Sequence, residues 1–155
     1  MADTPLKTMW LLHGVNLDML GRRDPAHYGA LTLAELERKV TAGAAARGFS
    51  MQCFQTNHEG DLVEKLHEIA REGAAAVIIN PGAWTHYSYA IRDALELIAA
   101  PIAEVHLSAV EEREEWRRRS VIADLATVRI SGRGVDGYVD AVEKLAAAIA
   151  AKPGS

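Results

Sequence analysis

Short apolar runs alternate with amphipathic segments along almost the whole chain, and this alternation limits the fold more than any other feature. The apolar runs, which are typical of buried strands, lie at residues 9–14, 50–56, 74–80, 101–108 and 126–131. The segments with helical spacing of apolar residues lie at residues 31–48, 61–73, 88–100 and 138–151. Because parallel strands need a crossover between them, this order predicts one doubly wound, five-stranded parallel sheet covered on both faces, in three α/β/α layers.

Capping residues mark where several of these helices begin and end. Thr32 lies three residues before a glutamate, which is capping-box spacing. Asp61 and Gly73 are placed to start and to stop the next helix. Ser108 and Glu111 repeat the capping-box spacing and predict a further helix through the charged segment EEREEWRRRS.

The composition is that of an ordinary globular protein and excludes several classes of function. A length of 155 residues predicts a single catalytic domain over residues 1–155, with residues 1–7 and 152–155 as flexible tails. The net charge of −4 argues against nucleic-acid binding. The single cysteine, Cys53, excludes an intrachain disulfide and a thiolate metal cluster. Without a signal-peptide pattern or an apolar run near the ~20 residues that span a bilayer, a cytoplasmic protein with no membrane contact is expected.

Polar residues gather directly after three of the predicted strands. Asn16 follows the first strand, and so does the loop GRRDPAHYG at residues 21–29, where neither the helical nor the strand period continues. The polar residues after the third and fourth strands are Asn80, Thr85, His86, Ser88, His106 and Ser108. Doubly wound sheets bind ligands outside the carboxyl ends of their strands, where the strand order reverses, so a site is predicted at this edge.

The residue types at this edge favour acid–base chemistry combined with anion recognition. No lysine lies at a strand end, which argues against Schiff-base catalysis, and no nucleophile elbow, Walker loop or dinucleotide-binding motif is present. His86 and His106 have no third metal ligand at a convincing spacing, so no metal site is predicted. Tyr28 lies near Arg22 and Arg23, and guanidinium groups favour the phenolate that acts as a base. An exposed tyrosine beside solvated arginines is the alternative for this stretch.

Four ordered motifs resemble those of the type II 3-dehydroquinate dehydratases. They are HGVNLDMLGRRDPAHYGALTLAELE, QTNHEGDLVEKLHEI, VIINPGAWTHYSYAIRDAL and EVHLSAVEEREEWRRRS. The resemblance implies a flavodoxin-like fold, a dodecamer built from trimers, and no metal or organic cofactor. It also implies cofactor-free anti elimination of water from 3-dehydroquinate, through an enolate, to give 3-dehydroshikimate. This reaction serves the shikimate pathway of aromatic amino acid biosynthesis or quinate catabolism.

The resemblance also implies roles for individual residues. Tyr28 is expected to take the C2 proton, Arg23 to hold that tyrosine as phenolate, and Asn16 to hold the water that stabilises the enolate. His106 is expected to protonate the departing C1 hydroxyl. The residues expected to bind the substrate hydroxyls are Asn80, His86 and Arg117. The residues expected to bind the substrate carboxylate at a helix N-terminus are Ser108 and the amide of Leu107. Asp93 is expected to come from a neighbouring subunit.

The chain departs from the family's pattern around these motifs. Residues 13–16, HGVN, stand in place of N-G-P-N. Trp84 and Tyr87 in NPGAWTHYS are expected to add bulk near the pocket, and Ala109 and Glu111 replace the Asn and His of S-N-V-H. None of these changes removes a residue expected in catalysis. A diverged paralogue that binds a related cyclic hydroxy acid, with weak or no dehydratase activity, is the alternative.

Overall fold

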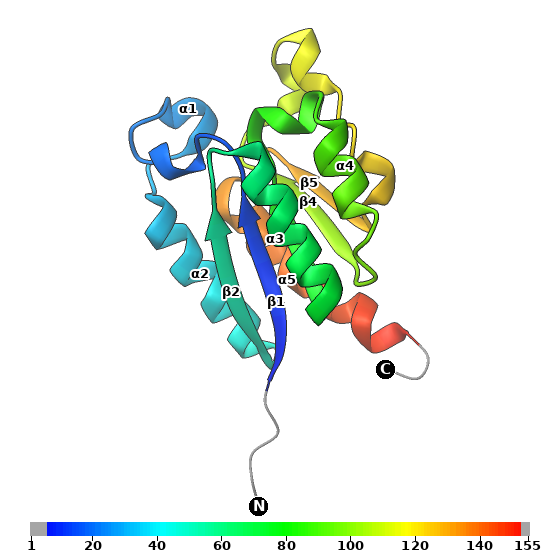
Figure 1. The fold of residues 1–155 in the computed structure, drawn as a ribbon. Coiled ribbons are helices and arrows are strands. Elements are labelled where there is room, and N and C mark those ends of the chain that lie inside the picture. The colour runs from blue at the N-terminus through cyan, green and yellow to red at the C-terminus, as the bar shows by residue number, and fades with distance from the viewer. Residues whose placement is uncertain (1–5, 153–155) are drawn as a thin grey trace, which may run out of the picture.

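A computed structural model describes residues 6–152 and contains one five-stranded sheet (Figure 1). The strands are β1 (Lys7–His13), β2 (Phe49–Gln55), β3 (Ala76–Asn80), β4 (Ile102–His106) and β5 (Val128–Ser131). All neighbouring strands are parallel, and their order is β2-β1-β3-β4-β5. This is the flavodoxin-like order, in which the chain reverses direction across the sheet between β1 and β3. The predicted strand arrangement is confirmed.

Helices cover both faces of this sheet. On one face lie α2 (Leu33–Ala46) and α5 (Gly134–Ala151), and on the other lie α3 (Glu59–Glu72) and α4 (Tyr89–Leu95) (Figure 1). Successive side chains of a strand point to opposite faces, so Met9 and Leu11 of β1 enter the α2/α5 core while Leu12 enters the α3/α4 core. The three-layer prediction is therefore also confirmed.

The ends of the helices agree with the capping predictions in part. The Thr32 hydroxyl accepts a hydrogen bond from the Glu35 amide at 3.2 Å, and Gly73 ends α3 with a φ of 83°. The N-cap prediction for Asp61 is wrong, because α3 begins at Glu59 and Asp61 lies in its first turn. An acidic residue remains favourable there because it faces the positive end of the helix dipole.

Two predicted helices are shorter than their sequence patterns. The pattern at 88–100 yields only α4, because the chain tightens into i→i+3 turns after Leu95 and then enters β4 through Pro101. The charged segment after β4 forms only the short 3₁₀ turns η3 (Val110–Glu112) and η4 (Glu115–Arg118). The predicted Ser108 cap is wrong, because the residue before η3 is Ala109 and no side chain caps this turn.

Two other segments are more ordered than predicted. Residues 25–28 form the short helix α1 (Pro25–Tyr28), where the Asp24 carboxylate accepts a hydrogen bond from the Ala26 amide and proline occupies the first helical position. Lys7, expected in a flexible tail, opens β1 and pairs with Phe49. The rest of the predicted tails lies mostly outside the described residues, at 1–5 and 153–155. Across residues 6–152 no helix is long and apolar enough to cross a membrane.

Candidate active site

A pocket of about 100 Å³ lies over the carboxyl ends of β1, β3 and β4, where the strand order reverses. The expected site residues that line it are Asn16, Arg23, Tyr28, Asn80, His86, His106, Leu107, Ser108 and Arg117. A larger hollow of about 560 Å³ opens at the opposite end of the sheet, but small apolar residues dominate its wall and no acid–base pair faces it. The smaller pocket is therefore the candidate site.

Close backbone packing brings Asn16 to this pocket. The chain leaves β1 through Gly14, where a Cβ atom would lie 2.1 Å from the Pro81 carbonyl oxygen, so only glycine fits. Asn16 follows with a φ of 69°, in the left-handed region that asparagine tolerates better than most residues. This tight packing of the chain after β1 against the chain after β3 lets Asn16 and Asn80 line the same pocket.

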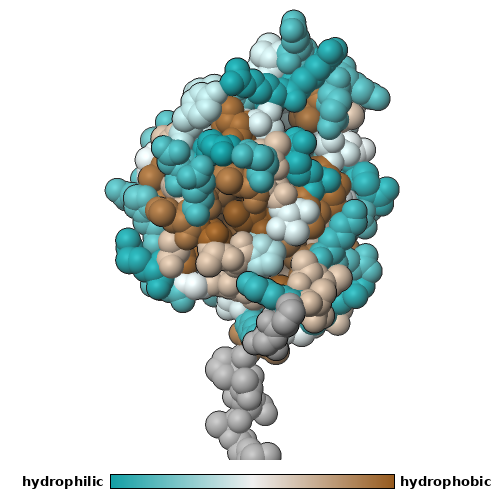
Figure 2. Space-filling model, turned by 90° about the vertical axis from the view of Figure 1, so that its right-hand side faces the viewer, coloured by the Kyte–Doolittle hydropathy of each residue, from teal (hydrophilic) through white to brown (hydrophobic). Residues whose placement is uncertain are grey.

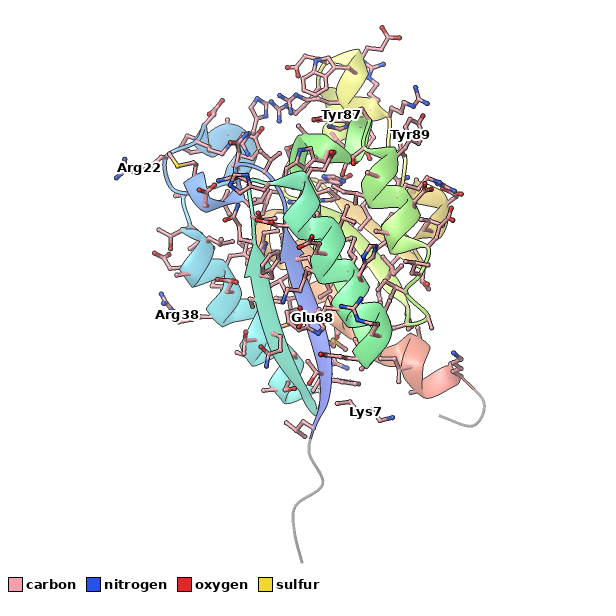
Figure 3. The ribbon with its side chains drawn as sticks, viewed as in Figure 1. Lys7, Arg22, Arg38, Glu68, Tyr87 and Tyr89 are labelled. Carbon is pink, nitrogen blue, oxygen red and sulfur yellow. The ribbon has the colours of Figure 1, made fainter. Side chains whose placement is uncertain are left out.

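Two arginines lie on Tyr28, the last residue of α1. The Arg23 guanidinium stacks over the tyrosine ring at 3.6 Å, and the Arg113 guanidinium donates a hydrogen bond to the tyrosine hydroxyl at 2.6 Å. Arg22 is exposed and extends away from the molecule (Figure 3). Positive charge and a donor at the phenol oxygen stabilise negative charge there, as a phenolate base requires.

Arg113 was not predicted from the sequence. It lies in a charged run that resembles a solvated helix, and the contact joins residues 85 positions apart. One sequence feature could have drawn attention to it. The charged run has no continuous apolar face, so it does not fit the pattern of an amphipathic surface helix.

A buried carboxylate holds His106 at the end of β4. Glu104 is 1% exposed, and its Oε2 atom lies 2.7 Å from His106 Nε2. Its Oε1 atom accepts hydrogen bonds from the Ser120 hydroxyl at 3.0 Å and from Arg129 Nε at 3.1 Å. Burial raises the pKa of Glu104. The hydrogen bond with His106, the hydrogen bond from Ser120 and the charge of Arg129 lower it, and together they hold the pKa below its usual value.

This pairing leaves His106 Nδ1 as the ring nitrogen for a ligand in the pocket. Sequence reasoning missed Glu104, although a charged residue in an otherwise apolar strand was the available signal. In a strand, residues two apart point to the same face, so the strand pattern places the side chains of Glu104 and His106 next to each other.

His86 and Asn80 present fixed polar atoms. A carbonyl oxygen can only accept, so the 2.6 Å contact between His86 Nδ1 and the Arg119 carbonyl places a proton on Nδ1 and leaves Nε2 as an acceptor. Desolvation lowers the pKa of His86 and favours this neutral ring, despite the opposing effect of that bond. Asn80 donates to the Tyr138 hydroxyl at 2.9 Å, and its side-chain oxygen accepts from the Gly82 amide.

Ser108 and Leu107 line the pocket but do not open a helix of useful length. The turn that follows them, η3, has only three residues, so the expected helix-dipole contribution to carboxylate binding is wrong. Their carbonyl oxygens accept hydrogen bonds from the amides of Gly132 and Gly134, which fixes the backbone at the end of β4. The Arg117 guanidinium, 4.1 Å from the Trp116 ring and paired with Glu114, supplies positive charge on the same wall.

Asp93 is exposed on α4 and does not line the pocket of its own chain. Its expected arrival from a neighbouring subunit stays a prediction. Among the residues that the structure describes, no group of three or more His, Cys, Asp or Glu side chains is arranged to hold a metal ion.

The departures from the family's pattern lie mostly outside the pocket. Val15 lines it, but His13 is fully buried behind it, with Nε2 3.4 Å from a Glu37 carboxylate oxygen. Trp84 is 6% exposed and belongs to the α3/α4 core, so it does not itself line the pocket, although Ala83 and His86 on either side of it do. Tyr87 is 59% exposed and lines a second hollow with Trp116, which shares His86 with the pocket, so its bulk lies near the pocket and not on its wall.

The other two departures also lie off this wall. Ala109 packs against Gly132. A Cβ atom added to Gly132 would lie only 3.0 Å from the Cβ atom of Ala109. The Glu111 carboxylate accepts hydrogen bonds from the Ser131 hydroxyl. Neither residue lines the pocket.

Comparisons with known proteins agree with this geometry. The sequence profile of the family described as "Dehydroquinase class II" matches residues 7–146. A "3-dehydroquinate dehydratase" from Syntrophotalea carbinolica is 53% identical over 133 residues, which cover 86% of this chain and 90% of the relative. One from Pelobacter propionicus is also 53% identical, over 86% of this chain and 89% of the relative. The crystal structure of a type II dehydroquinase from Propionibacterium acnes superposes with a TM-score of 0.87 at 38% identity, over 91% of this chain and 97% of that one. The chain therefore belongs to the class II dehydroquinase family.

Proposed function

We propose that this protein is a type II 3-dehydroquinate dehydratase, which removes water from 3-dehydroquinate to give 3-dehydroshikimate. One observation carries the proposal most directly. Tyr28, in contact with Arg23 and Arg113, lines the same pocket as His106, which the buried Glu104 holds from behind its Nε2 atom. A phenol oxygen in contact with two guanidinium groups and a carboxylate-held imidazole can serve as the base and the acid that an elimination needs.

In the first step, Tyr28 as phenolate takes the C2 proton of the substrate. The electron pair of that C–H bond moves toward the C3 carbonyl, and an enolate forms. A water molecule held by Asn16 donates a hydrogen bond to the enolate oxygen. Arg113 donates to the Tyr28 oxygen and Arg23 lies over the ring, so both guanidinium groups are placed to stabilise negative charge on that oxygen.

In the second step, the enolate collapses to a C1–C2 double bond and the C1 hydroxyl leaves. His106 Nδ1 gives this hydroxyl a proton, so that it departs as water. Glu104 orients the ring through the 2.7 Å contact with Nε2. Tyr28 then releases the proton that it took and His106 takes up one proton in its place, so the net change is the loss of one water molecule from the substrate.

The remaining pocket residues hold the substrate. Asn80, His86 and Arg117 would bind the ring hydroxyls, and the neutral His86 does so through Nε2 as an acceptor. The Ser108 hydroxyl and the Leu107 amide would bind the carboxylate, supported by the nearby guanidinium groups rather than by a helix dipole.

The working protein would be a homo-oligomer of trimers, assembled as a dodecamer, in which Asp93 of one subunit enters the site of the next. Exposed aromatic residues near α4 support this proposal, since Tyr87, Tyr89 and Trp116 are all more than half exposed. Figure 2 shows an apolar area bounded by hydrophilic residues on the side of the molecule that bears α4. Contiguous apolar area of this kind is typical of protein–protein contacts.

Turnover of 3-dehydroquinate, followed by the ultraviolet absorbance of the conjugated enone product, tests the proposal. We expect the wild type to turn over the substrate and Tyr28→Phe to lose about 10²–10⁴-fold in kcat, because the base is removed while the ring remains. Absence of turnover in folded, assembled wild type would exclude the dehydratase and favour a binding protein for a related hydroxy acid.

A further inference from the structure

The loop that carries Asn16 is held from outside the pocket by the end of β2. Asn57 Oδ1 accepts a hydrogen bond from the Asn16 amide at 2.8 Å, and Asn57 Nδ2 donates to an Asp18 carboxylate oxygen at 3.1 Å. Gln55 Nε2 donates both to Asn57 Oδ1 and to the Gly14 carbonyl, each at 3.2 Å. Gln55 and Asn57, here called the β2 clamp, thus form hydrogen bonds with every second residue of the loop, namely Gly14, Asn16 and Asp18.

The chemistry of the groups fixes the orientation of the Asn57 amide. A backbone N–H can only donate, so the atom that faces the Asn16 amide must be the oxygen. A carboxylate can only accept, so the atom that faces Asp18 must be the nitrogen. The backbone around Asn57 is itself fixed through its neighbour Thr56. The Thr56 hydroxyl accepts a hydrogen bond from the His58 amide at 3.0 Å, and the Thr56 amide donates one to the His13 carbonyl at 3.2 Å.

Asn16 needs such an anchor more than its neighbours do. It is the one non-glycine residue in the range 6–152 with a positive φ, and this conformation is energetically costly for an L-residue. The loop stays attached to the domain without the clamp, because Leu17 is 2% exposed in the core and the Gly14 amide donates to the Asn80 carbonyl at 2.8 Å. The clamp therefore governs the angle at which Asn16 faces the pocket rather than the attachment of the loop.

We propose that Asn57 is a positioning residue for the reaction, fixing the left-handed backbone of Asn16 so that its side chain faces the developing enolate. Asn57 does not line the pocket, so it acts through Asn16 and not on the substrate. The proposal rests on the proposed function for its kinetic consequence, but the clamp itself is measurable without turnover. Small errors in the placement of a group that stabilises charge are costly, since a shift of about 1 Å costs up to about 10²-fold in rate.

A pair of substitutions distinguishes the clamp from general stability. Asn57→Ala removes the side-chain contacts with Asn16, Asp18 and Gln55. It is expected to lower kcat about tenfold while KM stays within about twofold, because substrate is bound by other residues. Asn57→Asp keeps an acceptor but places a carboxylate against Asp18, so kcat falls similarly. In Asn57→Asp/Asp18→Asn, the amide introduced at position 18 donates to the carboxylate introduced at position 57, and kcat returns to within about threefold of wild type.

Ser50→Ala is the matched control. It removes the side-chain contact between Ser50 and Thr8, 2.9 Å long, at the other end of the same strand pair, and its kcat should equal that of wild type. Hydrogen–deuterium exchange of the Asn16 amide gives the readout that needs no turnover. Exchange should accelerate in Asn57→Ala and not in Ser50→Ala.

Three outcomes would overturn the inference. They are an unchanged kcat in Asn57→Ala, unchanged exchange of the Asn16 amide in that variant, and failure of the double substitution to recover activity while its unfolding midpoint matches that of wild type. Lack of turnover in the wild type would instead remove the proposed function, and the exchange comparison would still test the clamp.

Discussion

At the residue scale, the two adjacent arginines of the loop at residues 21–29 differ sharply in what they contact. Arg23 stacks on Tyr28, whereas Arg22 extends away from the molecule (Figure 3). Arg113 joins Arg23 on the tyrosine from a segment far along the chain. Adjacent positions on an irregular loop point in different directions, so the pair Arg22–Arg23 supplies one functional residue and one solvated residue.

We predict that Arg23→Met and Arg113→Met each lower kcat by about 10–100-fold, because each removes a positive charge or a hydrogen-bond donor from the surroundings of the proposed base, Tyr28. Arg22→Met, the matched control, should stay within about twofold of wild type. Steady-state kinetics on the three purified variants provide the measurement. Equal losses in all three would mean that net charge near the pocket matters and the individual contacts do not.

The buried Glu104 links stability to pH. Its pKa in the folded state lies below the ordinary value of 4.5, so ionised Glu104 favours folding above that pH. This contribution is lost as the pH falls below 4.5 toward the lowered pKa of the folded state. Arg129 is one cause of the lowering, and its side chain is 46% exposed, so its share is screened by solvent.

We therefore predict that Arg129→Gln moves the midpoint of acid unfolding upward by about half a pH unit or less, because the pKa of Glu104 rises when the cation is removed. Circular dichroism between neutral pH and pH 2 measures it. Arg133→Gln, which removes the exposed partner of Asp140, serves as control. Coincident acid transitions in wild type and Arg129→Gln would show that Ser120 and His106 suffice to keep Glu104 ionised.

At the scale of elements, two N-caps of similar chemistry should have different consequences. Asp24 caps α1, which has four residues and no buried side chain, while Thr32 caps α2, whose Leu36, Val40 and Ala44 are buried in the core. A short helix without a core face depends on its cap to keep its shape. α1 carries Tyr28, so its shape determines where the phenol oxygen lies.

We predict that Asp24→Ala lowers kcat/KM about five- to tenfold with little change in Tm, because loss of a cap costs about 1 kcal/mol of helix stability. Thr32→Ala should do the reverse, destabilising the whole domain by about 1 kcal/mol and leaving kcat/KM near that of wild type. Thermal unfolding and kinetics on both variants separate the two. A lowered Tm in Asp24→Ala with unaltered kinetics would contradict the proposed role of α1.

At the scale of the whole molecule, the exposed position of Asp93 makes the subunit arrangement testable. If Asp93 acts in the neighbouring site, a mixture of Asp93→Asn and Tyr28→Phe subunits contains some sites with a native Tyr28 from one chain and a native Asp93 from the other. In randomly mixed, symmetric rings these make up about a quarter of all sites.

We predict that each variant alone is nearly inactive and that mixed oligomers, formed by partial denaturation and reassembly, regain about a quarter of wild-type activity. A mixture of Tyr28→Phe and Arg23→Met subunits is the control. Residues 23 and 28 reach each site from the same chain, so every site in this mixture carries one of the two substitutions and no recovery is expected. Activity that stays absent in the Asp93 mixture would place Asp93 outside the reaction.

Most of the architecture was predictable from local pattern. Buried strands and amphipathic helices follow from periodicity over a few residues, and parallel pairing follows from the helices between the strands. Gly73 and Thr32 marked helix ends correctly because caps act within one turn. The failures lie where tertiary contacts compete with local preference. Glu111, which has capping-box spacing after Ser108, binds the Ser131 hydroxyl on β5 instead.

The sequence by itself determined the edge of the sheet at which the site lies and most of the residues that line it. The reason is that the carboxyl ends of parallel strands all lie at the same edge of the sheet, whatever path the connecting segments take. Only the tertiary structure decided how those residues are held. Arg113 on Tyr28, Arg129 on Glu104 and Asn57 on Asn16 join positions that are 85, 25 and 41 residues apart. No local period encodes such contacts, since they form only after the sheet and its loops have packed.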